Sequence, residues 1–409
     1  MKYNSRMDKR YDLIIIGSGP AGLSTALHLD RLLRANSERN ERDPKPDTLI
    51  LEKARHPRHK LCAGGVLPDG ERILAKLGLD LTEVPHVDVD KAALNYQMKG
   101  MKASGLGKQP IFRVVRRAEF DAWLADHVRA CGIPIQEEVT VKKITAYADY
   151  VLVETDRGNY QAKVVVGADG SNSVVRRAVE KNTATHVARA LEVITPLPAD
   201  FVEKAEVEAS FDFVAVPQGI SGYVWDFPAL VDGQPMRCQG IYDSNILRRE
   251  NRQPLRKILA AEMEKKGYDL NDYPLQGHPI RWYESESTPS RPRILLVGDA
   301  LGVDALLGEG ISPALGYGRV AAEEIFHAFK SGDFSFSGYK KRLARSHLGR
   351  ALNRRTFLAR LFYRLKRAEW QKLIWHRFGW LAGLIGVLWV TGWEKKRDGL
   401  SRQKRGDRA

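Results

Sequence analysis

Short apolar runs alternate with helical patterns in the first part of the chain. The run Tyr11–Ile16 is rich in β-branched residues and ends at glycines, after which an apolar helical pattern extends from Leu23 to Leu33. Two further runs, Thr48–Lys53 and Ala162–Val166, have the same strand-like composition. This alternation of buried strands and helices predicts an α/β fold.

The pattern changes between about residues 180 and 289. Short strands interrupted by Pro and Gly predominate there, with one helical pattern near Leu255–Lys266, and we expect a mostly antiparallel β-sheet. Tyr223, Trp225 and Phe227 alternate along one of these strands, so their rings face the same side. The alternation alone favours an ordinary core face, although the rings could also line an apolar wall.

These changes of pattern predict three parts of the chain. The first is a discontinuous α/β domain, the second a mostly antiparallel domain, and the third a basic helical tail. Their expected bounds are residues 1–85, 111–182 and 290–330 for the first, residues 86–110 and 183–289 for the second, and residues 338–409 for the tail.

The glycines that follow the first strand have the spacing G-x-G-x-x-G. Gly17 permits the tight turn, Gly19 lets the backbone approach a pyrophosphate, and Gly22 lets the helix pack closely on the strand. The start of the helix that follows offers free N–H groups and the positive end of its dipole to phosphates, and we expect Pro20 and Ala21 of the turn to contact the cofactor as well. Because a strand precedes the motif and a helix follows it, we predict a Rossmann-type dinucleotide site.

An acidic residue ends the second strand. Glu52 can accept the ribose hydroxyls of an adenosine, and the alternative is a solvated glutamate at a strand end. Glu52 lies thirty residues after Gly22, and the polar insert Ser37–Asp47 accounts for this long spacing. We therefore favour the ribose role, with Lys53 next to it.

Three later loops also carry candidate chemistry. Gly64 and Gly65 indicate a close approach of the backbone to a ligand. The loops Gly167–Ser173 and Gly298–Ala314 each follow a strand and lead into a helix, an arrangement typical of anion-binding or polar-ligand corners.

The three cysteines, Cys62, Cys131 and Cys238, form no C-x-x-C pair. Neither a metal site nor a disulfide framework is therefore predicted, and Cys62 taken alone is most simply a small buried hydrophobe.

The net charge of +15 is concentrated in the tail. From Tyr339 onward the chain has 20 Lys/Arg and only 4 Asp/Glu, so the remainder of the 409 residues is close to neutral. This distribution argues against a body that binds nucleic acid and favours a tail that meets an anionic surface.

The tail also has the pattern of a membrane-associating segment. Arginines are interleaved with Leu, Phe and Tyr from Tyr339 to Lys372, and sixteen uncharged residues follow from Phe378 to Trp393. Sixteen residues are fewer than the roughly twenty that a spanning helix needs. We predict a peripheral or monotopic anchor on the cytoplasmic side of a membrane, and the alternative is a C-terminal helix packed on the body. Tryptophans flank the uncharged segment as an aromatic belt would: Trp370, Trp375, Trp380, Trp389 and Trp393.

Taken together, the motifs resemble the FAD-binding domain of the p-hydroxybenzoate-hydroxylase-type flavoproteins and, within that group, the geranylgeranyl reductase family. The broader resemblance is carried by the first glycine turn with Glu52, by Gly167–Ser173 with Arg176, and by Gly298–Ala300. The narrower resemblance is carried by the loop Lys60–Gly65, the strand Tyr223–Pro228 and the turn Gly308–Ile311.

The resemblance implies FAD as the cofactor and assigns roles to individual residues. Arg117 would lie near FAD, Tyr223, Trp225 and Phe227 would line an apolar substrate cavity, and Cys62 is the candidate catalytic residue. The family loop commonly reads Cys-Gly-Gly, whereas Ala63 follows Cys62 here, which weakens that last assignment. The remaining residues expected to contact FAD are Ala63, Gly64, Gly65, Asp169, Gly170, Asp299, Gly308, Gly310 and Ile311.

The activity implied is reduction of C=C bonds in an isoprenoid, geranylgeranyl-type substrate by hydride from reduced flavin. The sequence has no second G-x-G-x-x-G motif, so NAD(P)H would dock transiently or a redox protein would donate electrons. The motifs single out no acid as the proton donor. Two alternatives remain open: an FAD-dependent monooxygenase or epoxidase that acts on an apolar substrate, and a membrane-bound electron-transfer flavoprotein.

Overall fold

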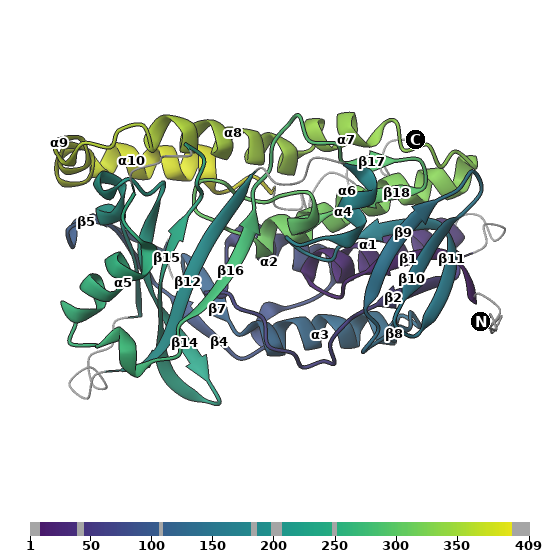
Figure 1. Cartoon of the computed structure of the whole chain (residues 1–409), viewed down its shortest axis with the longest axis horizontal. Helices are drawn as coiled ribbons and strands as arrows, with labels where there is room; N and C mark the ends of the chain where they lie inside the picture. Colours follow the sequence, from purple (N-terminus) through teal and green to yellow (C-terminus); the bar gives the residue numbers. More distant parts are fainter. Residues whose placement is uncertain are drawn as a thin grey trace, which may run out of the picture.

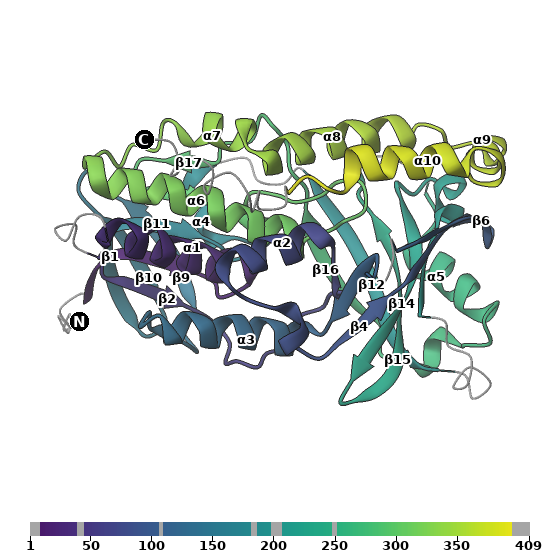
Figure 2. The same ribbon diagram turned by 180° about the vertical axis from the view of Figure 1, so that it is seen from behind.

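The protein is elongated, with two large β-sheets placed side by side and a layer of C-terminal helices along one side of both (Figures 1 and 2). The computed structural model describes residues 9–38, 45–105, 109–180, 186–197, 207–247 and 252–394. Part of the predicted polar insert and residues 395–409 of the tail therefore lie outside the described residues.

An eight-stranded sheet holds the first glycine turn. Strand β1 (Lys9–Ile16) pairs in parallel with β2 (Thr48–Leu51) on one side and with β11 (Gly158–Gly167) on the other. Leu13 to Ile16 are buried, which explains why this stretch is apolar on both faces. The sheet also contains β8 (Ile135–Gln136), β9 (Val141–Ala146), β10 (Val151–Thr155), β17 (Ser290–Arg291) and β18 (Ile294–Leu296).

Helices cover this sheet. Helix α1 (Pro20–Ser37) packs against α6 (Ile311–Ser331) at a contact between Ser24 and Gly318, where an added Cβ would lie 2.4 Å from the Ser24 Oγ. The Ser24 hydroxyl donates to the carbonyl of Leu315 at 2.7 Å, so the two helices are also joined by a buried hydrogen bond. The other helices of this part are α2 (Pro68–Leu77), α3 (Arg117–Ala130) and α4 (Val174–Val179).

The second sheet has seven strands in the order β16-β12-β15-β14-β13-β5-β6, and all neighbours are antiparallel except β13 and β5. Helix α5 (Leu255–Glu264) packs against it. The bounds of the strands are β5 (Lys91–Tyr96), β6 (Lys99–Ser104), β12 (Val187–Pro196), β13 (Glu208–Asp212), β14 (Gly222–Val231), β15 (Gln234–Asp243) and β16 (Gln276–Arg281).

A small three-stranded sheet lies between the two large ones. It consists of β3 (Gly65–Val66), β4 (His86–Val89) and β7 (Phe112–Val115), which pair antiparallel. The predicted combination of a Rossmann-type α/β unit, a mostly antiparallel sheet and a helical tail is confirmed, whereas the residue bounds of the domains stay a prediction.

The tail is a series of short helices that pack on the body. Helices α7 (Tyr339–Arg345) and α8 (His347–Phe362) run along the molecule, and α9 (Ala368–Lys372) and α10 (Gly379–Ile385) return beside α8 (Figure 1). Five-residue π-helical turns begin at Leu373 and Gly386. The uncharged segment is thus divided into short pieces. Across the described ranges of the chain, no helix is both long and apolar enough to cross a membrane.

Candidate functional site

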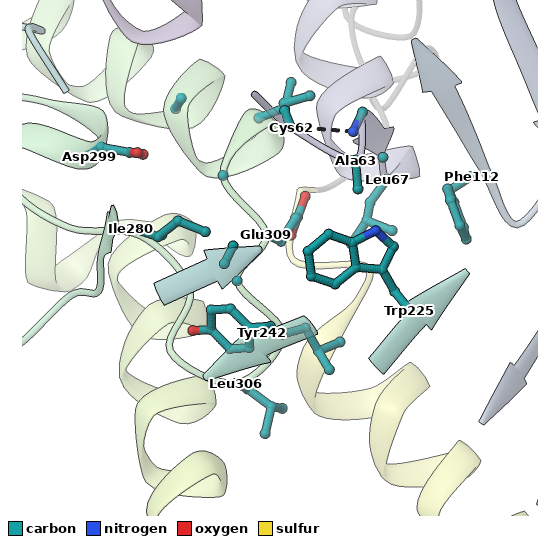
Figure 3. Close-up of a pocket in the computed structure, with 18 of the residues that line it drawn as sticks. Cys62, Ala63, Leu67, Phe112, Trp225, Tyr242, Ile280, Asp299, Leu306 and Glu309 are labelled. Atoms are coloured by element: carbon teal, nitrogen blue, oxygen red, sulfur yellow. Dashed lines mark hydrogen bonds between the residues drawn. The ribbon is translucent and has the colours of Figure 1, made fainter. Parts of the chain in front are cut away.

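A cavity of about 1420 Å³ extends from the glycine turn of the eight-stranded sheet to the seven-stranded sheet and the underside of the tail. Figure 3 shows its central part, where Trp225 lies among Ala63, Phe112 and Glu309. Every site residue predicted from the sequence lines this cavity except Gly22. Residues that are far apart in the chain are therefore brought together, while their individual roles stay predictions.

The glycine turn has the geometry that its spacing predicts. Gly17 has a φ of +102°, a conformation that favours glycine, and a Cβ on Gly22 would lie 2.1 Å from the carbonyl oxygen of Gly17. Gly22 therefore serves close packing inside the fold, which is why it does not line the cavity. Helix α1 begins after Gly19 without a side-chain cap, so its first N–H groups are free to meet an anion.

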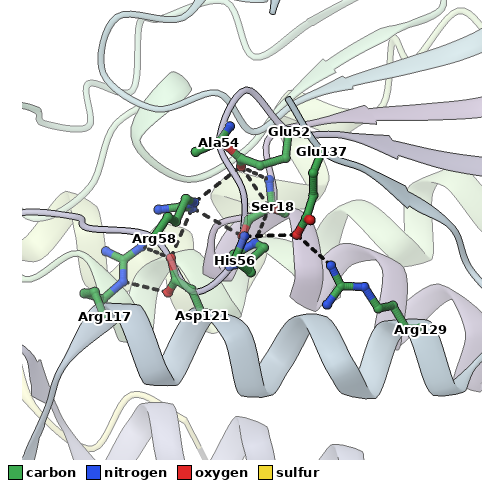
Figure 4. Close-up of polar contacts among 9 residues, drawn as sticks. All are labelled: Ser18, Glu52, Ala54, His56, Arg58, Arg117, Asp121, Arg129 and Glu137. Atoms are coloured by element: carbon green, nitrogen blue, oxygen red, sulfur yellow. Dashed lines mark hydrogen bonds and ion pairs between the residues drawn. The ribbon is translucent and has the colours of Figure 1, made fainter. Parts of the chain in front are cut away.

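Two arginines stand beside this turn. A Cβ built on Gly19 would have the guanidinium groups of Arg58 and Arg117 as its nearest side chains, at 3.7 and 3.8 Å. Arg117 forms two hydrogen bonds of 2.7 Å to Asp121, and Arg58 lies 3.1 Å from the same carboxylate (Figure 4). Asp121 thus holds both cations next to the helix N-terminus, where a pyrophosphate is expected.

Glu52 is buried at the end of β2 and is charged. Its Oε2 accepts the N–H of Ser18 at 2.9 Å and the Ser18 hydroxyl at 2.8 Å, and Arg58 Nε lies 3.6 Å away (Figure 4). Burial alone would raise the pKa of this carboxyl, but Arg58 and the two bonds from Ser18 outweigh it and lower the pKa. An ionised acceptor therefore borders the cavity next to Lys53, at the place predicted for the adenosine ribose.

The two aspartates of the later motifs have different environments. The carboxylate of Asp169 accepts the hydroxyl of Ser173 at 2.5 Å and the N–H of Val174 at 2.6 Å, so it is engaged at the start of α4. Asp299 accepts the Ser171 hydroxyl at 3.2 Å and faces the cavity. Burial raises the pKa of Asp299, and Lys60 and Arg117 partly offset this effect. Asp299 is therefore better placed than Asp169 to hold a cofactor hydroxyl.

The loop that leads into α6 is fixed by three buried tyrosines. The hydroxyl of Tyr223 donates to the carbonyl of Leu307 at 2.5 Å, that of Tyr363 to Leu306 at 2.6 Å, and that of Tyr242 to Ala305 at 3.2 Å. This loop continues into Gly308, Gly310 and Ile311, all of which line the cavity.

The same loop is tied to the tail. The buried guanidinium of Arg355, on α8, donates to Glu309 at 2.6 Å and lies 3.5 Å from Asp304. The expected flavin turn is therefore held from both the second sheet and the tail.

The aromatic strand forms one wall of the cavity. Tyr223, Trp225 and Phe227 are buried on one face of β14, and Phe211 of β13 packs against Tyr223 and Phe227 with ring centroids 5.3 and 4.9 Å apart. The placement agrees with a substrate wall. The hydroxyl of Tyr223, however, is directed to the loop of Leu307, so this residue presents only its ring to the cavity.

Cys62 lies on the loop that carries Ala63, Gly64 and Gly65. Its Sγ accepts the N–H of Gly64 at 3.4 Å (Figure 3). Burial raises the pKa of the thiol, which favours the neutral form over a thiolate nucleophile. The candidate catalytic role of Cys62 stays a prediction. Among its described contacts, the thiol has no base of the kind that activates a cysteine.

Several cavity residues were not predicted from the sequence as site residues. They are Arg58, the neighbouring pair Lys60 and His278, Glu192 on β12, and the tail residues Leu358, Phe362, Trp375, Phe378, Leu381 and Ile385. No local pattern predicts their place in the site, because the contacts that join them to it are made only in the folded chain. The amphipathic pattern of the tail does predict an apolar face, but it does not indicate that this face covers a cavity.

Comparison with known proteins agrees with the fold and the cofactor. The family model described as FAD binding domain matches residues 10–218, which is more than half of the chain. An uncharacterized protein of Methanosarcina barkeri is 28% identical over 87% of this chain and 84% of its own length. The digeranylgeranylglycerophospholipid reductase of Methanosarcina mazei is 25% identical over 80% of this chain and 78% of its own length.

A solved structure extends the comparison to the whole fold. The geranylgeranyl bacteriochlorophyll reductase-like protein of Thermoplasma acidophilum superposes with a TM-score of 0.69 and 19% identity, covering 93% of this chain and 99% of that protein. The likeness therefore includes both sheets and most of the tail.

The observed residues fit FAD. An anionic pyrophosphate matches three features: the uncapped start of α1, the bare backbone at Gly19 and the guanidinium groups of Arg58 and Arg117. Glu52 offers a charged acceptor beyond them. The chain belongs to the FAD binding domain family and is an FAD-dependent oxidoreductase of the geranylgeranyl reductase-like type.

Proposed function

We propose that this oxidoreductase saturates C=C bonds of an isoprenoid chain of the geranylgeranyl type. When bound, FAD in its reduced form supplies hydride to one carbon of such a bond. The protein would bind the apolar chain, exclude water around it and provide the proton for the second carbon. NAD(P)H or a redox protein would supply the electrons.

One observation carries this proposal: a single cavity joins the expected flavin turn to a wall of apolar side chains. Beyond Gly308 and Ile311 the lining consists largely of rings and aliphatic groups from β14, from β5 and β6, and from the tail. A long, flexible hydrocarbon fits such a surface, since binding it removes apolar area from water on both partners. The resemblance to proteins named as geranylgeranyl-type reductases supports the same substrate class.

An anaerobic experiment separates this proposal from its alternatives. The holoprotein is reduced with dithionite and mixed with geranylgeranyl diphosphate or a digeranylgeranyl glycerolipid while the flavin spectrum is followed. Reoxidation without oxygen supports the reductase. Product that forms only after oxygen is admitted supports a monooxygenase, and reoxidation only by a redox partner supports an electron carrier. Either of these results would contradict the proposal.

We also infer that the tail places the cavity against a lipid surface on the cytoplasmic side of a membrane. Phe378, Leu381 and Ile385 line the cavity and are also exposed, so they form an apolar opening in the tail. Trp380, Leu384 and Trp389 extend this exposed surface, and Trp380 is 67% exposed. An isoprenoid chain that partitions into a bilayer could enter the cavity from such a surface.

Charge favours an anionic bilayer. Lys372, the last residue of α9, and Arg377, on the turn that joins α9 to α10, are exposed near the apolar opening. Basic side chains beside exposed tryptophans are typical of helices that lie in a membrane interface.

Sedimentation with vesicles tests the inference. Trp380→Asp should reduce binding to vesicles that contain phosphatidylglycerol by about tenfold or more, since it places a charge where an indole would enter the interface. Tyr147→Asp is the matched control, because Tyr147 is also an exposed aromatic residue but lies between β9 and β10, away from the tail. Equal binding of both variants and the parent protein would contradict a role for the tail.

A further inference from the structure

A single row of paired residues crosses the cavity face of the seven-stranded sheet. From one edge to the other the partners are Gln276, Glu192, Gly240, Trp225, Phe211, Leu94 and Met101. Paired residues on neighbouring strands point to the same face, and all of these except Gly240 line the cavity. Glu192 is the one acidic residue in this row.

Gly240 brings the indole of Trp225 toward Glu192. A Cβ on Gly240 would lie only 2.2 Å from Cζ2 of Trp225, so the ring occupies the space that a side chain on β15 would otherwise fill. Glu192 is the next residue in the row, on β12. The acid therefore stands at the end of the aromatic wall and faces the same space as the expected substrate.

The surroundings of Glu192 favour a protonated carboxyl group near neutral pH. The side chain is buried, with 5% of the residue exposed, and the backbone N–H of Cys62 acts on its carboxyl group. The other titratable groups that act on it are Lys60 and Arg116, and it in turn acts on Cys238. Burial raises the pKa of Glu192 to about 7, against the smaller opposing effects of the Cys62 N–H, Arg116 and Lys60.

The other acids of the cavity are occupied by different partners. Glu309 is paired with Arg355, Asp169 bonds Ser173 and Val174, and Glu52 bonds Ser18. Asp299 borders the flavin turn and accepts the hydroxyl of Ser171. Glu192, by contrast, is buried, lines the cavity and lies near the backbone N–H of Cys62.

We propose that Glu192 is the catalytic acid that donates the proton to the second carbon of the C=C bond. This assignment rests on the proposed function. In the step, the first carbon accepts the hydride that the reduced flavin would supply. The π electrons of the C=C bond then form the C–H bond at the second carbon as the O–H bond of the Glu192 carboxyl breaks. The C=C bond becomes a single bond, the flavin is oxidised, and Glu192 is left as a carboxylate.

The carboxylate regains its proton at the edge of the cavity. Gln276 stands next to Glu192 on β16, and two residues further along that strand His278 Nε2 contacts Nζ of Lys60. Burial lowers the pKa of Lys60 to about 8 and that of His278 to about 4. Near neutral pH, the two groups therefore do not both carry a charge. His59, which also lines the cavity, is exposed at this edge and bonds Gln276, so water has access there.

The conservative variant Glu192→Gln removes the acid and keeps the size and polarity of the side chain. In anaerobic single turnovers with a geranylgeranyl compound, we expect the rate of alkene reduction to fall by about 100-fold or more, since general acids of this kind contribute about 10² to 10⁴. The rate of the parent protein should decrease as pH rises through about 7, and the variant should lose this dependence. Glu262→Gln is the control, because Glu262 is a buried carboxyl on α5 that does not line the cavity.

A second readout does not depend on turnover. Infrared difference spectra of the cofactor-free protein should contain a protonated carboxyl band that disappears with a midpoint near pH 7 and is absent from Glu192→Gln. If the parent protein reduces no alkene, the proposed function fails. If it does, and Glu192→Gln reduces the alkene at the parent rate or the infrared band is missing from the parent protein, the assignment of Glu192 fails while the proposed function stands.

Discussion

The two ends of the cavity are built on opposite principles. The cofactor end consists of bare backbone, a helix N-terminus and ion pairs, in which Arg58 and Arg117 share Asp121. The substrate end consists of rings and aliphatic side chains that converge from the second sheet and the tail, with Glu192 as an acid among them. Charge and hydrogen bonds fix one ligand in one position, whereas an apolar wall selects a class of ligands by shape.

The largest effect is expected from a change at the cofactor end. Gly22→Ala places a Cβ 2.1 Å from the carbonyl oxygen of Gly17, so the backbone of the turn must move. We expect the purified variant to contain no bound FAD, as measured by its absorbance spectrum. Gly338→Ala is the control, since its Cβ would have only an ordinary contact of 3.5 Å with Glu324. A Gly22→Ala protein with a full flavin spectrum would refute this account of the turn.

The next largest effect is expected where Arg355 of the tail binds the loop that lies between the cofactor end and the substrate end. Arg355→Met leaves Glu309 buried without its cation, and breaking a buried ion pair in this way costs about 3–5 kcal/mol of unfolding free energy. Urea denaturation measures the loss.

Arg360→Met is a matched change on the same helix, at an ion pair with Glu284 in which the arginine side chain is 46% exposed. The expected loss is below about 1 kcal/mol. Similar losses for the two variants would show that the tail does not depend on the buried pair.

A smaller effect distinguishes the acid at the substrate end. Because the pKa of Glu192 is about 7 in the folded protein and 4.5 ordinarily, the stabilisation due to its protonation is complete below pH 4.5 and is lost as pH rises through about 7. Relative to Glu192→Gln, the cofactor-free parent protein should lose up to about 3 kcal/mol of unfolding free energy over this range. Parallel stability curves for the two proteins would contradict the raised pKa.

The smallest effect is expected from Arg58→Gln. Asp121 keeps its two bonds to Arg117, so the variant removes one positive charge from the turn, together with the ion pair of 3.6 Å between Arg58 and Glu52. FAD should bind about tenfold more weakly, which corresponds to about 1.4 kcal/mol, in a fluorescence titration. Arg129→Gln, which belongs to the same region in Figure 4 but bonds only Asp126 and Glu137 among the residues described, should bind FAD as the parent does.

The two ends also differ in how far the sequence predicts them. The turn at Gly17, the acid at Glu52 and the corner at Asp299 each lie directly after a strand, and local spacing defines their geometry. The fold class was predicted correctly for this reason, and the family resemblance that these motifs carry predicted the cofactor and the enzyme class correctly. For Asp169 the motif indicates the corner correctly, but whether the carboxylate meets a ligand or begins a helix depends on the side chains around it.

The substrate end depends on contacts that no local pattern contains. Glu192 and Trp225 flank Gly240 in one row only because β12, β15 and β14 are neighbours in the sheet, and the indole reaches over β15 only because Gly240 lacks a side chain. The tail was predicted as a membrane anchor with a packed helix as the alternative. Its helices do pack on the body. Because apolar residues such as Trp380 are nevertheless exposed, we still propose that the tail associates with a membrane.

The most direct test of the central claim is the stoichiometry of an anaerobic turnover. Reduced holoprotein is mixed with a geranylgeranyl lipid, the oxidised flavin is measured by absorbance, and the lipid product is analysed by mass spectrometry. We expect one saturated C=C bond for each flavin oxidised, in the absence of oxygen. A flavin that stays reduced until oxygen is admitted, with the lipid unchanged or oxygenated, would contradict it.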